Sequence, residues 1–147
     1  MKIFIFIFIL FATLYTVNTA PHQLYKRTTT FEPCDASVPG LNVTIIPDPL
    51  VAGQNVTFAV VGITPSYNIT KNKTILEIGF IHDLDNATYH DKTFNKSFPP
   101  NTTYSIKASD IPVPSDYDEK FWTTLVLVGD LDPDNPKILF VFGCSFH

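Results

Sequence analysis

Hydrophobic and polar residues alternate in short stretches along most of the chain, and clusters of Pro, Gly, Asn and Asp separate these stretches. In residues 55–62, Val56, Phe58 and Val60 share one parity, while Asn55 and Thr57 take the other. This two-residue period is typical of strands with one buried face. No stretch of ten or more residues shows the 3.6-residue period of a capped helix. Seven strands are predicted, at residues 41–46, 55–62, 75–82, 88–94, 103–109, 121–129 and 138–144.

Seven short strands separated by turn residues predict an all-β domain over residues 31–147, an immunoglobulin-like antiparallel sandwich of two sheets. The predicted strands at 121–129 and 138–144 are apolar on both parities, so we expect them to be central or to face a partner. Many phenylalanines fall on plausible inward positions. From this pattern alone, an ordinary packed core is favoured over a cavity.

The first 20 residues differ from the rest of the chain. Met1-Lys2 precedes an apolar run at residues 3–14, and small residues follow up to Ala20. This is the layout of a secretory signal peptide, and the run is shorter than the roughly 20 residues that span a membrane. We expect a signal peptide at residues 1–20 and a flexible segment at 21–30. The protein is expected to be secreted, or held in the lumen of the endomembrane system, which includes the vacuole or lysosome.

Two further features fit an oxidising, secretory compartment. Asn-x-Ser/Thr, the acceptor motif for N-glycosylation, occurs at seven of the nine asparagines. The predicted glycosylation sites are Asn42, Asn55, Asn68, Asn72, Asn86, Asn95 and Asn101. The two cysteines, Cys34 and Cys144, lie near opposite ends of the predicted domain. Two free thiols or a metal pair are the alternatives to a disulfide, which the compartment favours.

Composition and charge exclude several classes of protein. Hydrophobic residues make up 45% and charged residues 16% of the chain, which excludes a disordered acidic chain. The net charge of −4 argues against a nucleic-acid partner, since binding to phosphates needs a basic surface. No nucleophile elbow or phosphate-binding loop is present, so we predict that the protein is not an enzyme and needs no cofactor.

Two groups of residues could approach a metal ion. Asp130, Asp132 and Asp134 have the opening spacing of a calcium loop, but the expected Gly and Glu are missing and a hairpin connection is favoured. The second group is explained at least as well by ordinary polar loop positions. Its members are His82, Asp83, Asp85, His90 and Asp91. No metal site is predicted.

The order of several short motifs is similar to that of a known family. Residues 41–58 contain Pro47-Asp48-Pro49 and Gly53-Gln54-Asn55 between two predicted strands. Tyr104-Ser105-Ile106 and Ile111-Pro112-Val113-Pro114 follow, with a cysteine near each end of the domain. This arrangement resembles the ML (MD-2-related lipid-recognition) domain over residues 31–144. Within that family it is most similar to the fungal phosphatidylglycerol/phosphatidylinositol transfer proteins, relatives of the NPC2-like sterol carriers.

The resemblance implies that the two sheets splay apart to hold a phospholipid or sterol, which a monomer carries between membranes by transient contact. It also implies a Cys34–Cys144 disulfide. Two further short-range disulfides of the family have no counterpart here. The side chains expected to line the lipid cavity are Phe58, Val60, Ile78, Phe80, Phe94, Phe98, Ile106, Trp122, Leu125, Leu127, Phe140 and Phe142. Phe121-Trp122 could form a wall of the cavity or contact a membrane, and packing of Trp122 in an ordinary core is an equal alternative. The alternative function is a secreted adhesion or ligand-sensing module with a solid core.

Overall fold

The structure is a computed structural model that describes residues 28–64, 68–83, 85–132 and 139–147. The predicted signal peptide and most of the segment at 21–30 lie outside these residues. Eight strands form the described part, and it contains no helix that could cross a membrane. The strands are β1 (Glu32–Pro33), β2 (Asn42–Ile46), β3 (Asn55–Ile63), β4 (Thr74–Ile81), β5 (Ala87–Thr93), β6 (Thr103–Pro112), β7 (Thr123–Leu131) and β8 (Leu139–Phe146).

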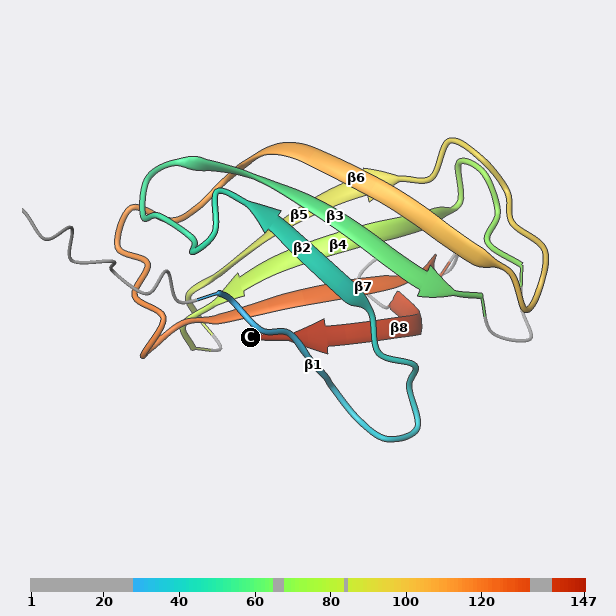
Figure 1. The fold of residues 1–147 in the computed structure, drawn as a ribbon, viewed down its shortest axis with the longest axis horizontal. Coiled ribbons are helices and arrows are strands. Elements are labelled where there is room, and N and C mark those ends of the chain that lie inside the picture. The colour runs from blue at the N-terminus through green and yellow to red at the C-terminus, as the bar shows by residue number, and fades with distance from the viewer. Residues whose placement is uncertain (1–27, 65–67, 84, 133–138) are drawn as a thin grey trace, which may run out of the picture.

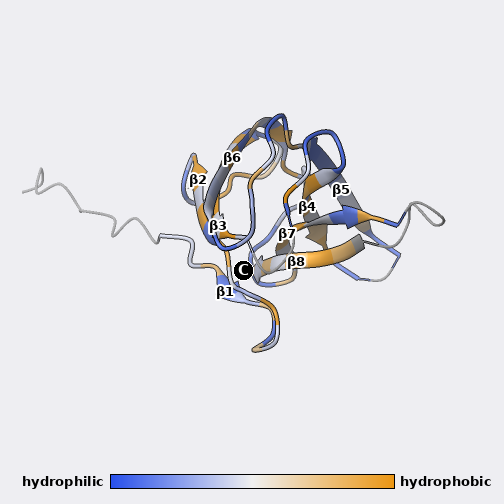
Figure 2. Ribbon diagram, turned by 90° about the vertical axis from the view of Figure 1, so that its right-hand side faces the viewer, coloured by the Kyte–Doolittle hydropathy of each residue, from blue (hydrophilic) through white to orange (hydrophobic). Residues whose placement is uncertain are grey.

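The strands form two antiparallel sheets that face each other (Figure 1). The five-stranded sheet has the order β1-β8-β7-β4-β5, and the three-stranded sheet has the order β2-β3-β6. Figure 2 shows the sheets as two separate layers, with β1 at their lower margin. The predicted all-β, two-sheet antiparallel sandwich is therefore confirmed. Strand β7 is central, as its apolar residues on both parities indicated, and it pairs with β8 as an antiparallel neighbour.

The seven predicted strands are all present, and two differences from the prediction have local causes. Strand β1 was not predicted, because it is only two residues long and ends in Pro33. Strand β6 runs on to Pro112, beyond the predicted end at Ser109. Its register shifts opposite β3 here, and Asp110 takes a positive φ of 60°. A β-bulge thus bends the strand where the sequence predicted its end.

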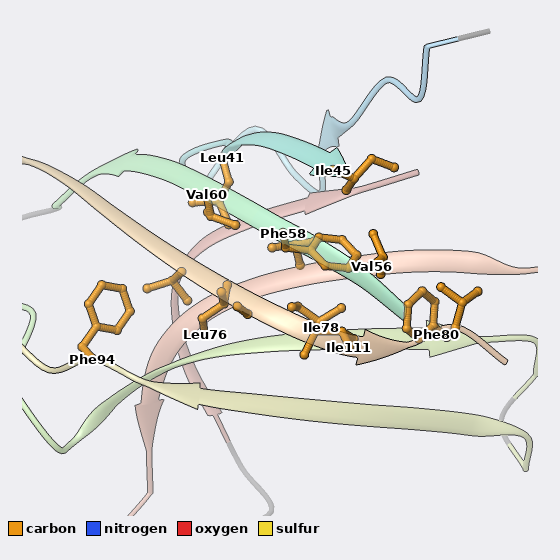
Figure 3. Packing of buried hydrophobic residues seen from close by; sticks show 14 of the residues in the cluster. Leu41, Ile45, Val56, Phe58, Val60, Leu76, Ile78, Phe80, Phe94 and Ile111 are labelled. Atoms are coloured by element: carbon orange, nitrogen blue, oxygen red, sulfur yellow. The ribbon is translucent and has the colours of Figure 1, made fainter. Parts of the chain in front are cut away.

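The space between the two sheets is filled by apolar side chains (Figure 3). Alternate residues of β3, β4 and β7 point inward. Seven apolar side chains among them are 0% exposed: Phe58, Val60, Leu76, Ile78, Phe80, Val126 and Val128. The rings of Phe58 and Phe80 meet edge to face across the sheets, with centroids 6.4 Å apart. Such edge-to-face pairs add to the free energy of burial.

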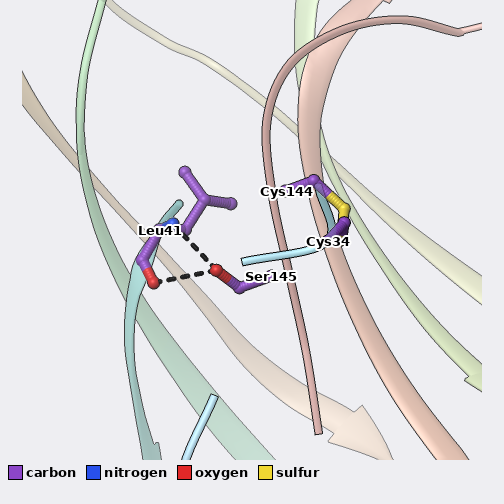
Figure 4. Close-up of a disulfide and its surroundings, with 4 residues drawn as sticks. All are labelled: Cys34, Leu41, Cys144 and Ser145. Atoms are coloured by element: carbon purple, nitrogen blue, oxygen red, sulfur yellow. Dashed lines mark hydrogen bonds between the residues drawn. A yellow bond between two sulfur atoms is a disulfide. The ribbon is translucent and has the colours of Figure 1, made fainter. Parts of the chain in front are cut away.

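One side of the sandwich is closed by a link between its first and last strands (Figure 4). Cys34 and Cys144 form the predicted disulfide, with Cα atoms 5.5 Å apart and a sequence separation of 110. Next to it, the Leu41 N–H donates to the buried Ser145 Oγ at 2.8 Å, and that hydroxyl donates to the Leu41 carbonyl at 3.1 Å. Because Leu41 directly precedes β2 and Ser145 lies in β8, these hydrogen bonds tie the two sheets together.

The outer face of the five-stranded sheet carries two carboxylates side by side. Glu77 of β4 is directly opposite Asp91 of β5, and Leu127 of β7 is its partner on the other side. Partial burial, and then the negative charge of Asp91, raise the pKa of Glu77. Like charges directly opposite each other destabilise a sheet.

The double substitution of Cys34 and Cys144 by serine should remove roughly 4–5 kcal/mol from the free energy of unfolding, since it releases a long loop in the unfolded chain. Urea unfolding of both forms measures this difference. The double variant should remain folded under mild conditions, because the Ser145–Leu41 hydrogen bonds and the core do not depend on the sulfur atoms. An unchanged unfolding midpoint would contradict this account.

The variant Asp91→Asn should be more stable than the parent at neutral pH, by about 0.5 kcal/mol, because it removes one of two facing charges that solvent partly screens. The pKa of Glu77 is raised in the folded state, so protonated Glu77 adds to the free energy of unfolding at pH values below its unfolded pKa. This contribution is lost as pH rises through the raised pKa. The gain should therefore vanish in acid. Urea unfolding at about pH 7 and about pH 3 tests this, with Glu32→Gln as the control.

Candidate functional site

A pocket of about 480 Å³ lies where the free edges of the two sheets meet, between the end of β5 and strand β6. Strand β5 is the last strand of the five-stranded sheet, and β6 is the last strand of the three-stranded sheet. The pocket is lined by Lys92, Thr93, Phe94, Asn95, Lys96, Phe98, Ser105, Ile106 and Lys107. Its volume falls within the range of small-molecule binding sites.

The apolar part of the pocket is continuous with the core. Phe94 is 2% exposed and marks one end of the core cluster in Figure 3, while Phe98 and Ile106 are partly buried against that cluster. The ring of Tyr104 completes the group, with centroids 5.7 Å from Phe94 and 6.2 Å from Phe98. Burial raises the pKa of Tyr104 to about 12, so its hydroxyl stays neutral at physiological pH.

Backbone hydrogen bonds hold these rings in place after β5 ends. The Phe94 N–H donates to the Thr74 carbonyl at 3.0 Å, so the residue after β5 stays attached to β4. Phe98 and Ile69 exchange two hydrogen bonds, of 2.9 and 3.0 Å, in an isolated bridge. Backbone hydrogen bonds therefore fix the chain at both ends of the segment from Phe94 to Phe98.

Three lysines surround this apolar group. Lys92 is opposite the core residue Leu76 on β4, so it lies on the inner face of β5, at the sheet edge. Lys96 follows β5, and Lys107 lies on β6, one residue beyond Ile106. All three are exposed, and among the described residues none has a carboxylate partner at salt-bridge distance. The pocket is thus locally positive on a chain whose net charge is −4.

A second, smaller pocket of about 290 Å³ has a different chemical character. Its lining is Thr29, Pro49, Leu50, Tyr117, Glu119 and His147. The Thr29 N–H donates to Asp48 Oδ1 at 2.9 Å, and His147 Nδ1 lies 3.0 Å from the Thr30 carbonyl. Among its described lining residues this pocket has Glu119 and no lysine, so this part of it is a poorer site for an anionic ligand.

The structure divides the twelve predicted cavity residues into several groups. Phe94, Phe98 and Ile106 come together in the lysine-lined pocket. Phe58, Val60, Ile78 and Phe80 are 0% exposed, so no water-sized void borders them in this conformation. A ligand would reach these four side chains only if the sheets moved apart. Phe140 is 54% exposed and Phe142 is partly buried, both on β8.

The interpretation of Leu125 and Leu127 as inward-facing residues is wrong. Thr124, Val126 and Val128 are 0% exposed and point toward the other sheet. The two leucines alternate with them and lie partly exposed on the outer face. Both parities of β7 are apolar and its inward set includes a threonine, so periodicity alone assigned the two faces the wrong way round.

Trp122 packs within the fold. It is 5% exposed, its indole N–H donates to the Asp116 carbonyl at 3.1 Å, and its ring lies 5.3 Å from that of His82. Phe121, the residue before it, is 67% exposed. Of this pair, only Phe121 is placed to contact a membrane.

The residues considered for metal binding have other neighbours. Asp130 lies in β7, where it accepts a 2.6 Å hydrogen bond from the Thr74 hydroxyl and pairs with Lys73 at 2.6 Å. Asp134 lies outside the described residues. His82 contacts Asp83 at 3.0 Å, whereas His90 and Asp91 are successive residues on opposite faces of β5. No cluster of three candidate metal ligands occurs in the described ranges.

Sequence reasoning missed the three lysines of the pocket. Lys92 has the same parity as His90, and Lys107 is next to the predicted cavity residue Ile106, so a search for cations beside the apolar set would have found them. All seven asparagines of the glycosylation motifs are exposed. One of them, Asn95, lies in the pocket lining.

The variant Gly62→Ala should destabilise the fold and disturb the pocket. A Cβ at Gly62 would overlap the hydroxyl of Tyr104, and would lie 2.6 Å from its Cζ atom. Overpacking of this kind costs about 1–3 kcal/mol. Urea unfolding gives the loss, and the near-ultraviolet circular dichroism of the Phe94–Phe98–Tyr104 group should change. Gly53→Ala, where the nearest atom is 3.9 Å away but φ is positive, separates backbone strain from this side-chain clash.

Comparisons of the chain with protein-family models, curated proteins and solved structures find no match. The similarity to the ML family therefore rests on the motifs quoted from the sequence. The lysine-lined pocket between β5 and β6 is the candidate site that the geometry provides.

Proposed function

We propose that the protein binds an anionic amphiphile, a phospholipid in the first instance, at the pocket between β5 and β6, and carries it between membranes. The observation that carries this proposal is the meeting of three predicted lipid-contacting residues, Phe94, Phe98 and Ile106, with three lysines that have no carboxylate partner among the described residues. The apolar residues and the lysines alternate within residues 92–98 and 106–107, and the fold brings these two segments together at the edges of the two sheets.

The apolar side of the pocket suits a hydrocarbon chain. Phe94 is fully part of the core cluster, while Phe98 and Ile106 keep some surface in contact with solvent. A ligand chain that covers this surface gains about 0.8 kcal/mol for each CH₂ group removed from water. The pocket volume of about 480 Å³ is suited to one acyl chain near its headgroup.

The charged side of the pocket favours a phospholipid over a sterol. A sterol offers one hydroxyl group, which needs no cation. A phosphate has several oxygen atoms and a negative charge, and lysines bind it through charge-assisted hydrogen bonds. Lys92, Lys96 and Lys107 lie around the apolar residues, where a headgroup would remain at the rim while its chain is buried.

Transfer of a whole lipid would need more room than this conformation provides. The core residues Phe58 and Phe80 are 0% exposed, so an incoming chain that extends beyond the pocket must separate the sheets. The side at β5 and β6 is suited to such opening, because the Ser145–Leu41 hydrogen bonds hold the sheets together on the opposite side. There the disulfide also anchors the chain to β8 before it crosses to β2.

The direct test is a lipid transfer assay. Protein purified from a secretory host should move a fluorescent phosphatidylglycerol between vesicles, and mass spectrometry of the purified protein should find bound lipid. The variant Lys107→Gln should reduce binding of the anionic lipid by about 2–5-fold, the effect of losing one exposed ion pair. Protein that is lipid-free and moves neither phospholipid nor sterol would refute the proposal.

A matched control is available. Lys120→Gln also removes one positive charge, but Lys120 is exposed and lies outside the pocket lining. It should leave phosphatidylglycerol binding unchanged. Equal losses in both variants would mean that the protein is attracted to anionic vesicles by its general charge, and would argue against a headgroup site at this pocket.

A further inference from the structure

The outer face of the five-stranded sheet carries apolar side chains that are exposed or partly exposed. One cross-strand row of the face is continuous, because Leu125 of β7 is opposite Phe146 on one side and Gly79 on the other. Gly79 is in turn opposite Tyr89 of β5. Tyr89 is 53% and Phe146 38% exposed. Leu125 and Leu127 are partly exposed on the same face.

A pair of carboxylates interrupts this apolar surface. Glu77 is opposite both Asp91 and Leu127, so the acidic pair lies beside the leucines of β7. Among the described residues, neither carboxylate has a Lys, Arg or His at salt-bridge distance. Two unneutralised charges on adjacent strands disfavour the isolated sheet, and a cation placed over them would remove that penalty.

The predicted glycosylation sites avoid this face. Asn42 and Asn55 are exposed on the outer face of the three-stranded sheet, since they alternate with its inward residues. The remaining five lie in the segments that connect the strands. Glycans at these positions would cover the other sheet and the ends of the sandwich. They would leave the face formed by β8, β7, β4 and β5 open to a partner.

We propose that this face is a docking surface for a protein partner that presents a lysine or arginine within an apolar contact surface. Three independent features support this choice: exposed apolar rows, a central acidic pair without a cation, and the absence of glycosylation motifs on the described part of the face. A membrane is a poorer occupant, because Glu77 and Asp91 would repel anionic headgroups. A second copy is also poorer, because it would bring another acidic pair into the interface.

Two synthetic hairpin peptides of equal length test the proposal. Both carry Leu and Val on one face, and they differ only in a central Lys or Glu. The Lys peptide should bind with at least tenfold higher affinity than the Glu peptide, measured by a surface biosensor. Amide shifts in the NMR spectrum should be confined to residues around Glu77, Asp91 and Leu127. Equal binding of the two peptides, or shifts elsewhere, would overturn the proposal.

Variants separate charge recognition from folding and from the lipid pocket. Glu77→Gln/Asp91→Asn should lower affinity for the Lys peptide about tenfold while the unfolding midpoint holds or rises. Asp116→Asn, which removes an exposed acid away from this face, should have no effect on peptide binding.

Leu125→Ser tests the other two occupants. If this variant abolishes self-association in the ultracentrifuge, the occupant is a second copy and the proposal is wrong. If it abolishes binding to phosphatidylglycerol vesicles, the occupant is a membrane and the proposal is wrong. Lys107→Gln, which tests the lipid pocket, should not alter peptide binding.

Discussion

The link between the two ends of the domain is the constraint on which the rest of the sandwich depends. Cys34 and Cys144 join β1 to β8, and β1 is only two residues long. The chain then crosses from the five-stranded to the three-stranded sheet within a few residues, and the Ser145 hydroxyl binds both backbone groups of Leu41 after that crossing. This side is held by covalent and buried polar contacts, whereas β5 and β6, at the far ends of the two strand orders, are free edges on the other side.

This asymmetry explains how one fold combines a filled interior with an accessible pocket. Between the middle strands, side chains such as Phe58 and Phe80 pack without a void. At the free edges the backbone after β5 curves away, and Phe94 and Phe98 pack against Tyr104 instead of against a further strand. The pocket is thus the place where the core reaches the surface. The interior is therefore filled between the middle strands, and a pocket opens at the edge formed by β5 and β6.

The sequence was a good guide to the strands and a poor guide to how they pair. Alternation located strands that have one clearly polar face, as Asn55 and Thr57 show on β3, while turn residues on either side marked the strands that are apolar on both parities. It failed on β7, where Leu125 and Val126 are equally apolar and only the contact with the opposite sheet distinguishes them. The bulge at Asp110 was also hidden, since a positive φ is a property of one backbone position and an aspartate can equally end a strand.

The candidate site could be predicted only in part for a related reason. Phe94, Phe98 and Ile106 were identified as apolar residues with inward parity, and lysines lie close to them in the sequence. The approach of residues 92–98 to residues 105–107, however, depends on which strands lie at the sheet edges. Edge positions follow from the order of strands, which periodicity does not contain. The facing carboxylates of Glu77 and Asp91 likewise depend on the register between β4 and β5.

The lysines on the edge strands have a consequence for the colloidal behaviour of the protein. A terminal strand exposes unpaired backbone N–H and C=O groups, which can template the addition of a strand from another molecule. Lys92 on β5 and Lys107 on β6 place a charge on each of these free edges. A strand approaching either edge would have to desolvate an ammonium group. Loss of these charges should therefore favour sheet-to-sheet assembly of folded molecules, a route to aggregation that requires no unfolding.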